Sequence, residues 1–506
     1  MKSALRERTV EREGTSFPSA TYAELILGPA YEQAKRHFVE PMLHIHRAHL
    51  IMLVEAGILP KSEAIPIARA ILSIDAEEIR SSEYEAKFED LFFKIEQMLI
   101  ERAGDAAGNL HIARSRNDMG IAIYRMTLRE KLLRLFEAGL ALREALIDLM
   151  EEHVDTVMIG YTHTQQAQPT TLAHYLHAMA DVLTRDLERI QSAYRCVNRS
   201  SMGAAALTTS GFPVNRRQVQ QLLGFEEMID NAWDAVAGAD YATETASAVQ
   251  LCALNLGRSI QDFLLWGTQE FGALTLADPY VQISSIMPQK RNPVAVEHTR
   301  ALLSSVVGDA QTVLWMVHNT PFGDILDTED DMQPYVWRAV DRLEGMFRLL
   351  TGVLLTMRVN RDKLLRRARE SFASVTELAD AIVRRERLPF RQAHHIVSEA
   401  VKELSRQGEA SLSMLTLDVL NRHARSVAGR ELTMAADEVA AALDPVHFVR
   451  VRSLEGGPSP DRMREAIQRK KREQETLKAW LDGKRSMLRE AKEGVDRILR
   501  GWVKEA

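Results

Sequence analysis

Residues 117–158, NDMGIAIYRMTLREKLLRLFEAGLALREALIDLMEEHVDTVM, contain no proline. Their apolar side chains recur at helical spacing, at Ile121, Tyr124, Leu128, Leu132, Leu135, Leu142, Leu146 and Leu149. This spacing places them on one side of an α-helix. At 1.5 Å per residue, a helix of roughly forty residues is about 60 Å long. A rod of that length is longer than one globular domain requires, which predicts a bundle of long helices.

Four further stretches show the same pattern. They begin after Pro169, near 240, at 293 and near 328, and the last ends at about 357. We expect each to form a helix of roughly thirty to forty residues, about 45–60 Å long. Such rods bury their apolar faces in bundles and by pairing with other subunits. The predicted fold is therefore all-α, with a central long-helix bundle over 114–365 between an N-terminal helical domain, 1–113, and a C-terminal helical domain, 366–506.

Composition narrows the class of protein. The 506 residues are 46% hydrophobic and 26% charged, as in ordinary globular proteins, and the formal net charge is only −6. Nucleic-acid binding would need a clustered basic excess. No apolar run reaches the eighteen residues of a membrane span, and the charged N-terminus does not resemble a secretory signal. With only Cys196 and Cys252, no disulfide framework is implied, and we expect a cytoplasmic protein.

The segment HIARSRND, residues 111–118, places Arg114, Arg116 and Asn117 just before the first long helix. A helix N-terminus offers free N–H groups and a positive dipole end, which favour a carboxylate or phosphate. Two guanidinium groups can add a bidentate grip on such an anion. A plain N-cap with two surface arginines fits this segment alone equally well.

The segment GYTHTQQAQPT, residues 160–170, crowds hydrogen-bonding groups, Thr162 and His163 among them, onto the connection between two long helices. A histidine there can act as an acid–base group or as a polar anchor for substrate. A lone histidine is more often structural, so this segment is weaker evidence by itself.

The segment QISSIMPQKRNP, residues 282–293, brings Ser284, Ser285, Lys290 and Asn292 together before another long helix. A serine removes a carbon-bound proton only if local cations and dipoles stabilise its alkoxide. The resulting carbanion must be stabilised too, and a lysine and an asparagine are suited to pairing with its carboxylate. A proline-shaped loop that merely exposes polar residues is the less favoured interpretation.

SSIMPQKRNP resembles the signature of the fumarase/aspartase superfamily. HIARSRND and GYTHTQQAQP resemble the other two conserved regions as they occur in argininosuccinate lyases. PFRQAHHIV at 389–397 and EGGPSP at 455–460 resemble that subgroup as well. Because these matches occur in the same order and cover roughly 90–460, the resemblance is far more specific than any single motif.

The resemblance implies three mostly helical domains and a homotetramer with a twenty-helix core. Each active site would collect the three motif regions from three different subunits. It also implies catalytic roles: Ser284 would be the base, Lys290 and Asn292 would stabilise the aci-carboxylate, and His163, oriented by Glu297, would bind substrate or assist the leaving amine.

The remaining residues of the implied substrate site are Arg114, Arg116, Asn117, Thr162 and Ser285. The resemblance implies neither a cofactor nor a metal. The clustered histidines, which are His44, His46, His49, His174 and His177, are accordingly interpreted as packing or surface residues.

The sequence also departs from the argininosuccinate-lyase pattern. Phe92 stands where the family commonly has His, and Ile283 replaces a usual Gly before Ser284. In TPFGDILDTEDDMQP, 320–334, the residues Phe322, Asp327 and Asp330 stand where the family usually has Tyr, Gln and Lys. Losing a lysine and gaining two acids favours an amine without its own α-carboxylate. Alternatively, Thr328 caps a helix and the acids that follow favour its first turn.

The expected function is reversible β-elimination of fumarate from an N-substituted L-aspartate. The departures favour an aminopolycarboxylate such as ethylenediamine-N,N′-disuccinate, as in the lyases named after that compound. The first alternative is an argininosuccinate lyase releasing arginine and fumarate. Fumarase, aspartase and adenylosuccinate lyase are less favoured, because the ARSRND string is not theirs. A non-catalytic, crystallin-like structural protein is disfavoured, because the implied catalytic residues are all present.

Overall fold

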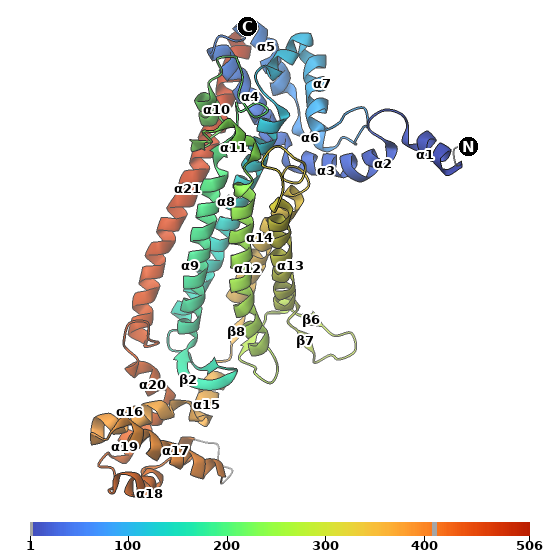
Figure 1. Ribbon diagram of the computed structural model, residues 1–506. Coiled ribbons are helices and arrows are strands. Elements are labelled where there is room, and N and C mark those ends of the chain that lie inside the picture. The colour runs from blue at the N-terminus through green and yellow to red at the C-terminus, as the bar shows by residue number, and fades with distance from the viewer. Residues whose placement is uncertain (1–3, 407–411, 506) are drawn as a thin grey trace.

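The computed structural model describes residues 4–406 and 412–505, apart from the side chain of residue 413. Five long helices run side by side through its middle (Figure 1): α8 (Arg116–Glu152), α9 (Leu172–Val197), α12 (Asp240–Trp266), α13 (Val294–Val317) and α14 (Gln333–Thr356). The structure confirms the predicted all-α fold with a central bundle. Shorter helices lie at both ends of the bundle.

The long helices are shorter than predicted except for the first. They contain 37, 26, 27, 24 and 24 residues. The fifth begins at Gln333, with Pro334 in its first turn, and not near 328. The Thr328 hydroxyl donates to the Ile325 carbonyl at 3.2 Å within a series of turns. The interpretation of Thr328 as a helix N-cap was therefore wrong, because residues 326–332 form turns.

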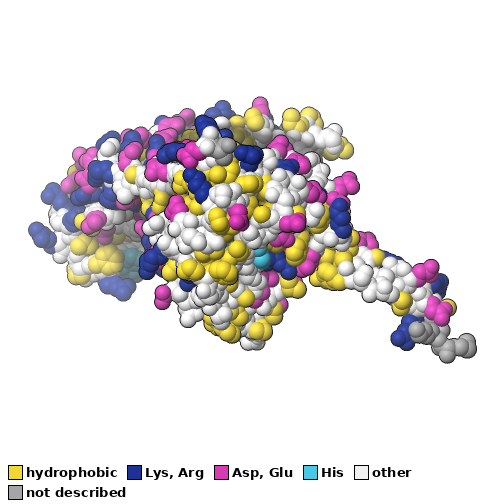
Figure 2. All heavy atoms as spheres, turned by 90° about the horizontal axis from the view of Figure 1, so that it is seen from above, with side chains coloured by type: hydrophobic (Ala, Val, Ile, Leu, Met, Phe, Trp, Pro, Cys, Tyr) yellow, Lys and Arg dark blue, Asp and Glu magenta, His cyan; other side chains and the backbone are white. Residues whose placement is uncertain are grey.

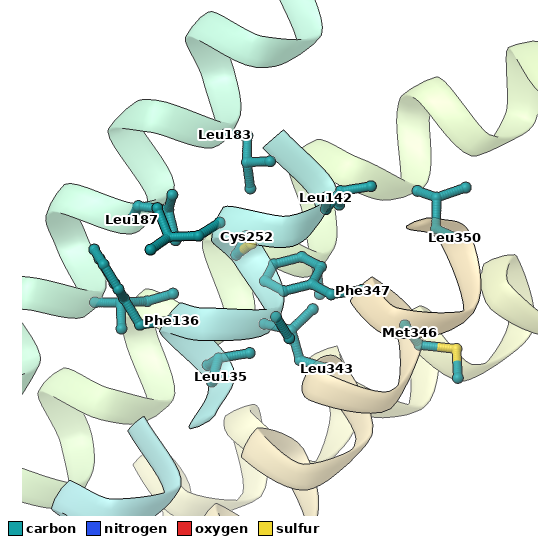
Figure 3. Packing of buried hydrophobic residues seen from close by; sticks show 14 of the residues in the cluster. Leu135, Phe136, Leu142, Leu183, Leu187, Cys252, Leu343, Met346, Phe347 and Leu350 are labelled. Carbon is teal, nitrogen blue, oxygen red and sulfur yellow. The ribbon is translucent and has the colours of Figure 1, made fainter. Parts of the chain in front are cut away.

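Leucine and phenylalanine side chains fill the space between the bundle helices (Figure 3). Phe136 of α8 lies near Leu187 of α9, Leu142 lies on the side of Leu183, and Phe347 of α14 packs into the same cluster. Gly139 of α8 allows this close approach, because an added Cβ would lie 2.6 Å from Leu187 Cδ2 and 3.3 Å from Phe347 Cε2. Each fully buried side chain of this size contributes about 1.5–3 kcal/mol to folding.

The N-terminal helices form a second hydrophobic cluster around the start of α8. They are α3 (Gly28–His37), α4 (Val39–Glu55), α5 (Lys61–Ser73), α6 (Ala76–Arg80) and α7 (Leu91–Ala103). The last helix, α21 (Pro460–Glu505), runs back along the bundle, and its residues Val495 and Leu499 join this cluster. The segment before α3, with α1 (Ala4–Glu13) and α2 (Ala20–Tyr22), projects from the body in both views (Figures 1 and 2).

The C-terminal helices lie at the other end of the bundle, and four of them share a hydrophobic cluster of their own. These four are α16 (Val375–Glu386), α17 (Phe390–Arg406), α18 (Leu417–Ala428) and α19 (Ala436–Leu443). Beside them, α15 (Arg361–Glu370) and α20 (Pro445–Val451) pack against β1 in a smaller cluster. The buried carboxylate of Glu377 accepts hydrogen bonds from Arg384 and Arg452. The predicted domain boundaries at 113/114 and 365/366 remain predictions.

Strands are few and short. β1 (Val157–Thr162) pairs antiparallel with β2 (Gln165–Thr171) between α8 and α9. Three two-residue pairs link loops: β3 (Arg199–Ser200) with β4 (Glu227–Met228), β5 (Leu274–Thr275) with β8 (Arg358–Val359), and β6 (Gln282–Ile283) with β7 (Arg291–Asn292). Two short helices, α10 (Arg216–Leu222) and α11 (Ala232–Ala237), precede α12. In the described part of the chain, no helix combines the length and apolarity that a membrane crossing needs.

Candidate active site

The tip of the β1–β2 hairpin carries Thr162 and His163. Thr162 pairs with Gln165, so His163 and Thr164 form a two-residue turn. Their φ angles are 51° and 62°, as in the type I′ turns that match the twist of a hairpin. The His163 side chain is consequently exposed at the far end of the bundle from the N-terminal helices. Gln168 Nε2 donates to Thr376 Oγ1 at 3.2 Å and ties the hairpin to the C-terminal helices.

Ser284 lies in the loop between β6 and β7, next to the start of α13. Its Oγ accepts hydrogen bonds from the backbone N–H groups of Ile286, at 3.3 Å, and Met287, at 3.0 Å. Two N–H dipoles aimed at one hydroxyl oxygen favour negative charge on that oxygen. The base of the loop is held by Arg291, which donates to the Asp278 carboxylate at 2.5 Å. These two donors would stabilise negative charge on the Ser284 oxygen.

The other predicted residues of this region surround the same loop. Ser285 and Lys290 are exposed near the two ends of the loop, and Asn292 is half-buried in β7. Glu297 is exposed in the first turn of α13. Among the contacts of the described residues, no hydrogen bond or ion pair joins Glu297 to His163.

The N-terminus of α8 is capped by Ser115. Its N–H donates to Asp118 Oδ1 at 3.0 Å, which completes a capping box. Arg116 Nη1 donates to Glu89 Oε1 at 3.0 Å and to Asp90 Oδ2 at 2.9 Å. Asn117 Nδ2 donates to Asp324 Oδ2 at 2.7 Å. The predicted anion-binding residues Arg116 and Asn117 therefore lie among carboxylates.

Arg114 points away from this surface into the N-terminal cluster. Its side chain is buried, and Nη1 lies 2.8 Å from His46 Nδ1. Burial lowers the pKa of Arg114 to about 10 and the pKa of His49 to about 3. The rings of His44 and His49 hydrogen-bond the carbonyls of Leu222 and Ile112. Arg114 thus packs inside the N-terminal cluster and does not line the neighbouring cavity, and its role in substrate binding remains a prediction.

A cavity of about 280 Å³ opens beside Arg116 and Asn117. Five carboxyl groups line it, those of Glu89, Asp90, Asp324, Glu329 and Asp330, and Arg116 is the one cationic side chain among its described lining residues. The remaining wall is mostly apolar: Phe17, Tyr22, Leu27, Ala30, Tyr31, Ala34, Phe38, Met42, Leu91, Phe92, Met119, Ile123, Tyr124 and Leu326. The cavity therefore combines an acidic part with an apolar part.

Two carboxyl groups of this cavity, those of Glu329 and Asp330, have a pKa above the ordinary value. Burial, together with a hydrogen bond and the charge of Asp324, raises the pKa of Glu329. Partial removal from water also raises the pKa of Asp330, although Asp330 is open to solvent on one side. The Tyr124 hydroxyl donates to Asp330 Oδ1 at 2.7 Å. An uncompensated negative charge of this kind favours a cationic ligand.

Phe322, Asp327 and Asp330 differ from the argininosuccinate-lyase pattern and were predicted to contact substrate, but only Asp330 lines the cavity. Phe322 and Asp327 are exposed on the preceding turns. The carbonyl of Phe322 accepts a hydrogen bond from Trp233 Nε1 at 2.8 Å, which fixes this segment beside α11.

The three predicted motif segments do not meet within one chain. Arg116 begins α8, and the hairpin with His163 follows the other end of that helix, about 55 Å away for 37 residues. Ser284 precedes α13 and the acidic segment follows it, about 36 Å away for 24 residues. Figure 1 shows the start of α8 and the acidic segment at one end of the bundle, and the β1–β2 hairpin and the β6–β7 loop toward the other.

Sequence reasoning missed several residues of this region. Glu89 and Asp90 pair with Arg116, and Asp324 accepts from Asn117, but nothing in their local spacing links them. Asp118 is fully buried, and its Oδ2 accepts from the N–H groups of Gly203 and Ala205 at 2.8 and 3.0 Å. For this helix start the sequence predicted an N-cap only, and neither the capping box nor the burial of Asp118 was predicted.

Comparison with known proteins adds family matches at two places. Residues 70–308 match the family model described as Lyase, and residues 372–450 match the one described as Argininosuccinate lyase C-terminal. The first match includes the three motif segments, and the second covers helices α16 to α20.

Individual relatives match over nearly the whole chain. Argininosuccinate lyase 2 of Agrobacterium fabrum is 42% identical over 467 residues, covering 90% of this chain and 91% of its own length. Argininosuccinate lyase of Methanothermobacter thermautotrophicus is 38% identical, with 89% and 94% covered. Crystal structures of EDDS lyase, one in complex with formate and one of a variant with bound fumarate, share 30% identity and a TM-score of 0.86, with 98% of both chains covered.

Proposed function

This chain belongs to the argininosuccinate lyase family and is a carbon–nitrogen lyase, and from that premise we propose that it catalyses the reversible elimination of fumarate from an N-substituted L-aspartate. The observation that carries the proposal is the loop around Ser284, where two backbone N–H groups point at the hydroxyl oxygen. Two N–H donors lower the cost of negative charge on that oxygen.

In the proposed reaction, Ser284 removes a proton from Cβ of the aspartate part of the substrate, the carbon next to the side-chain carboxylate. The electron pair left behind is delocalised into that carboxylate, where Lys290 and Asn292 stabilise the added charge. The carbon–nitrogen bond then breaks, the C=C bond of fumarate forms, and the amine leaves with a proton. His163 supplies or orients that proton, with Glu297 beside it, while Thr162, Arg116, Asn117 and Ser285 hold the carboxylates.

We further propose that the site is completed by other copies of the chain in a homotetramer. The motif segments lie too far apart in one chain for a single small substrate to touch them all. Large apolar side chains are exposed on the bundle, with Leu251 and Leu254 of α12 at 44% and 50% and Trp315 of α13 at 69%. Exposed apolar side chains on long helices favour packing against further helices.

The acidic part of the cavity favours an amine without a carboxylate of its own. Even if the raised pKa keeps Glu329 protonated, the other four carboxyl groups outnumber the one guanidinium, so they would repel the α-carboxylate of arginine and attract an ammonium group. Arginine remains the second candidate, because the relatives at 42% and 38% identity are named argininosuccinate lyases. The cytoplasmic location also remains a prediction.

The ultraviolet absorbance of fumarate tests the substrate. Purified protein is mixed with fumarate and either ethylenediamine or arginine, and the loss of absorbance is followed. We expect consumption with ethylenediamine. Consumption with arginine alone would make the protein an argininosuccinate lyase and would leave the acidic segment without a role in specificity.

The Ser284→Ala variant tests the proposed base. We expect turnover to fall by at least about a hundredfold, as typical for loss of a general base, while fumarate still binds. Ser405→Ala, an exposed serine of α17, serves as the matched control. If Ser284→Ala retained wild-type turnover, a different residue would have to be the base.

A further inference from the structure

We propose that His174 is a positioning residue, which holds the β1–β2 hairpin in the direction that the reaction requires. The hairpin carries Thr162 and His163 at its tip, and His174 joins its base to the turn formed by the segment EGGPSP, residues 455–460. This inference rests on the proposed function, and it gives a role to a segment that the proposed function leaves unused. His174 lies in the first turn of α9 and acts through the hairpin, without touching substrate.

The ring of His174 makes two hydrogen bonds, one from each nitrogen. Its Nε2 lies 2.9 Å from the carbonyl oxygen of Gly456, and because a carbonyl only accepts, Nε2 carries the proton and donates. In the neutral ring Nδ1 then accepts from the Thr170 hydroxyl, 2.8 Å away. The backbone N–H of His174 donates to Oγ1 of Thr171, the N-cap of α9, at 3.1 Å. His174 therefore links β2, the start of α9 and the turn at one point.

Two glycines fix the shape of this turn. Gly456 has a φ of 79°, in the left-handed region that favours glycine. A Cβ added to Gly457 would overlap the carbonyl oxygen of Arg452. The Gly457 N–H donates to the Leu454 carbonyl at 2.9 Å, and the Ser459 N–H donates to the Arg452 carbonyl at 3.4 Å. The Gly456 carbonyl is therefore held in one place, as an anchor for the hairpin must be.

The turn and the hairpin are both attached to helix α16. The Arg452 guanidinium donates to the buried carboxylate of Glu377. The preceding residue, Thr376, accepts a hydrogen bond from Gln168 of β2 at 3.2 Å. One connection from α16 to the hairpin thus runs directly through Gln168, and a second runs through Arg452, the turn and the His174 ring. Two attachments at different points of one strand oppose rotation about either of them, so together they fix the direction of the strand.

In one chain the tip of the hairpin has no anchor of its own. Among the described residues, no hydrogen bond or ion pair reaches the exposed ring of His163. The tip begins four residues beyond Gln168, which is about 13 Å along a strand, so a rotation of about 4° at Gln168 would move it by about 1 Å. Such a displacement of a catalytic group lowers the rate by as much as about a hundredfold. Loss of the His174 ring nitrogens should therefore lower kcat more than it raises the KM for fumarate.

The first measurement is the rate of fumarate consumption by His174→Phe, which keeps a ring but loses both hydrogen bonds. The assembled enzyme is isolated by gel filtration and assayed with whichever of ethylenediamine and arginine the wild type consumes. We expect kcat to fall at least about tenfold and KM to change less than about threefold. His174→Gln places an amide N–H near the position of Nε2 and should recover most of the lost rate.

The matched control is His423→Phe, which removes a 2.8 Å hydrogen bond to Glu403 within the C-terminal helices and should keep the wild-type kcat. Thr170→Val removes the hydroxyl that pairs with Nδ1 and should lower kcat in the same direction as His174→Phe, so a folding defect at one position does not decide the test. An unchanged kcat in both His174→Phe and Thr170→Val would overturn the inference, and so would equal losses in His174→Phe and His174→Gln.

A double-mutant cycle with His163 separates positioning from stability. In the His163→Asn background, His174→Phe should lower kcat by less than about twofold, because the direction of the hairpin no longer matters once the ring is gone. A tenfold loss in both backgrounds would contradict the inference. If His163→Asn alone kept the wild-type rate, the role of His163 in the proposed function would be wrong, and the inference would fall with it. If only the His174 variants kept the wild-type rate, the inference alone would fail.

Discussion

Replacing Arg116 by Gln is expected to raise the KM for fumarate about 10- to 100-fold while changing kcat little. Arg116 is the one cationic side chain among the described residues that line the cavity. Its Nη1 lies 3.0 Å from Glu89 and 2.9 Å from Asp90, so it both neutralises these carboxylates and faces the opening where fumarate would bind.

The magnitude follows from two contributions. The Arg116 side chain is 42% exposed, so each ion pair is screened and contributes no more than about 1 kcal/mol. A charge-assisted hydrogen bond from the guanidinium to a fumarate carboxylate adds about 1.5–3 kcal/mol. Since 1.4 kcal/mol corresponds to about tenfold in affinity, a loss of one to two decades is expected. Because the interaction holds both bound substrate and transition state, it should appear in KM.

The assay is the initial rate against fumarate concentration at saturating amine, at low and high salt. Arg102→Gln is the matched control, since Arg102 is also ion-paired, to Glu78 at 2.9 Å, but lies outside the cavity. The difference between the two variants should shrink in 1 M salt, where the screening length is about 3 Å. If Arg116→Gln and Arg102→Gln had the same KM as the wild type, Arg116 would not hold a substrate carboxylate.

Two further predictions concern stability. Glu329→Gln should raise the melting temperature at alkaline pH but not near pH 4. Burial and Asp324 raise the pKa of Glu329, so the folded protein binds this proton more tightly than the unfolded chain does. The resulting stabilisation is complete below the ordinary pKa of a glutamate and is lost as the pH rises through the raised pKa. An equal change in melting temperature at both pH values would argue against the raised pKa. Gly139→Ala should destabilise the bundle by about 1–3 kcal/mol through overpacking against Leu187. The control is Gly483→Ala at an exposed position of α21, where nothing lies within 4 Å of the added Cβ, and it should stabilise the protein by roughly 0.5–1 kcal/mol. The free energy of unfolding of both variants is measured in urea. Changes of the same sign in the two variants would refute the packing argument.

The helix bundle could be predicted from the sequence because it depends on the local periodicity of apolar residues. The spacing over 117–158 predicted a long helix, and the observed α8 ends at Glu152. The chain after it enters β1, since residues such as Val157 and Ile159 pack against Ala368 and Val449 of the C-terminal region. That tertiary packing is not visible in helical spacing. The fifth helix was misplaced for a similar reason: Thr328 has the form of an N-cap, yet turns continue to Met332.

The site was only partly readable. Short motifs make Ser284, His163 and Asn117 candidate site residues, because the chemistry expected of each is carried by a few neighbouring residues. The direction of Arg114 could not be read, since it depends on His46, which is 68 residues away. The acidic cavity likewise joins Asp90 to Asp330 across 240 positions of the chain. Contacts at such sequence separation follow from the packing of whole helices and leave no local pattern.

The central claim is that one chain supplies only part of each active site. It is tested most directly by mixing two inactive variants, Ser284→Ala and Asn117→Ala, after dissociating and reassembling their subunits. If a site takes Ser284 and Asn117 from different copies, random assembly leaves about a quarter of the sites with both residues intact.

We therefore expect the reassembled mixture to recover about a quarter of the wild-type rate of fumarate consumption, while each variant reassembled alone stays inactive. A mixture that assembles into mixed oligomers, shown by differently tagged subunits, yet remains inactive would contradict the account. It would mean that Ser284 and Asn117 of the same chain serve one site, despite the length of the bundle between them.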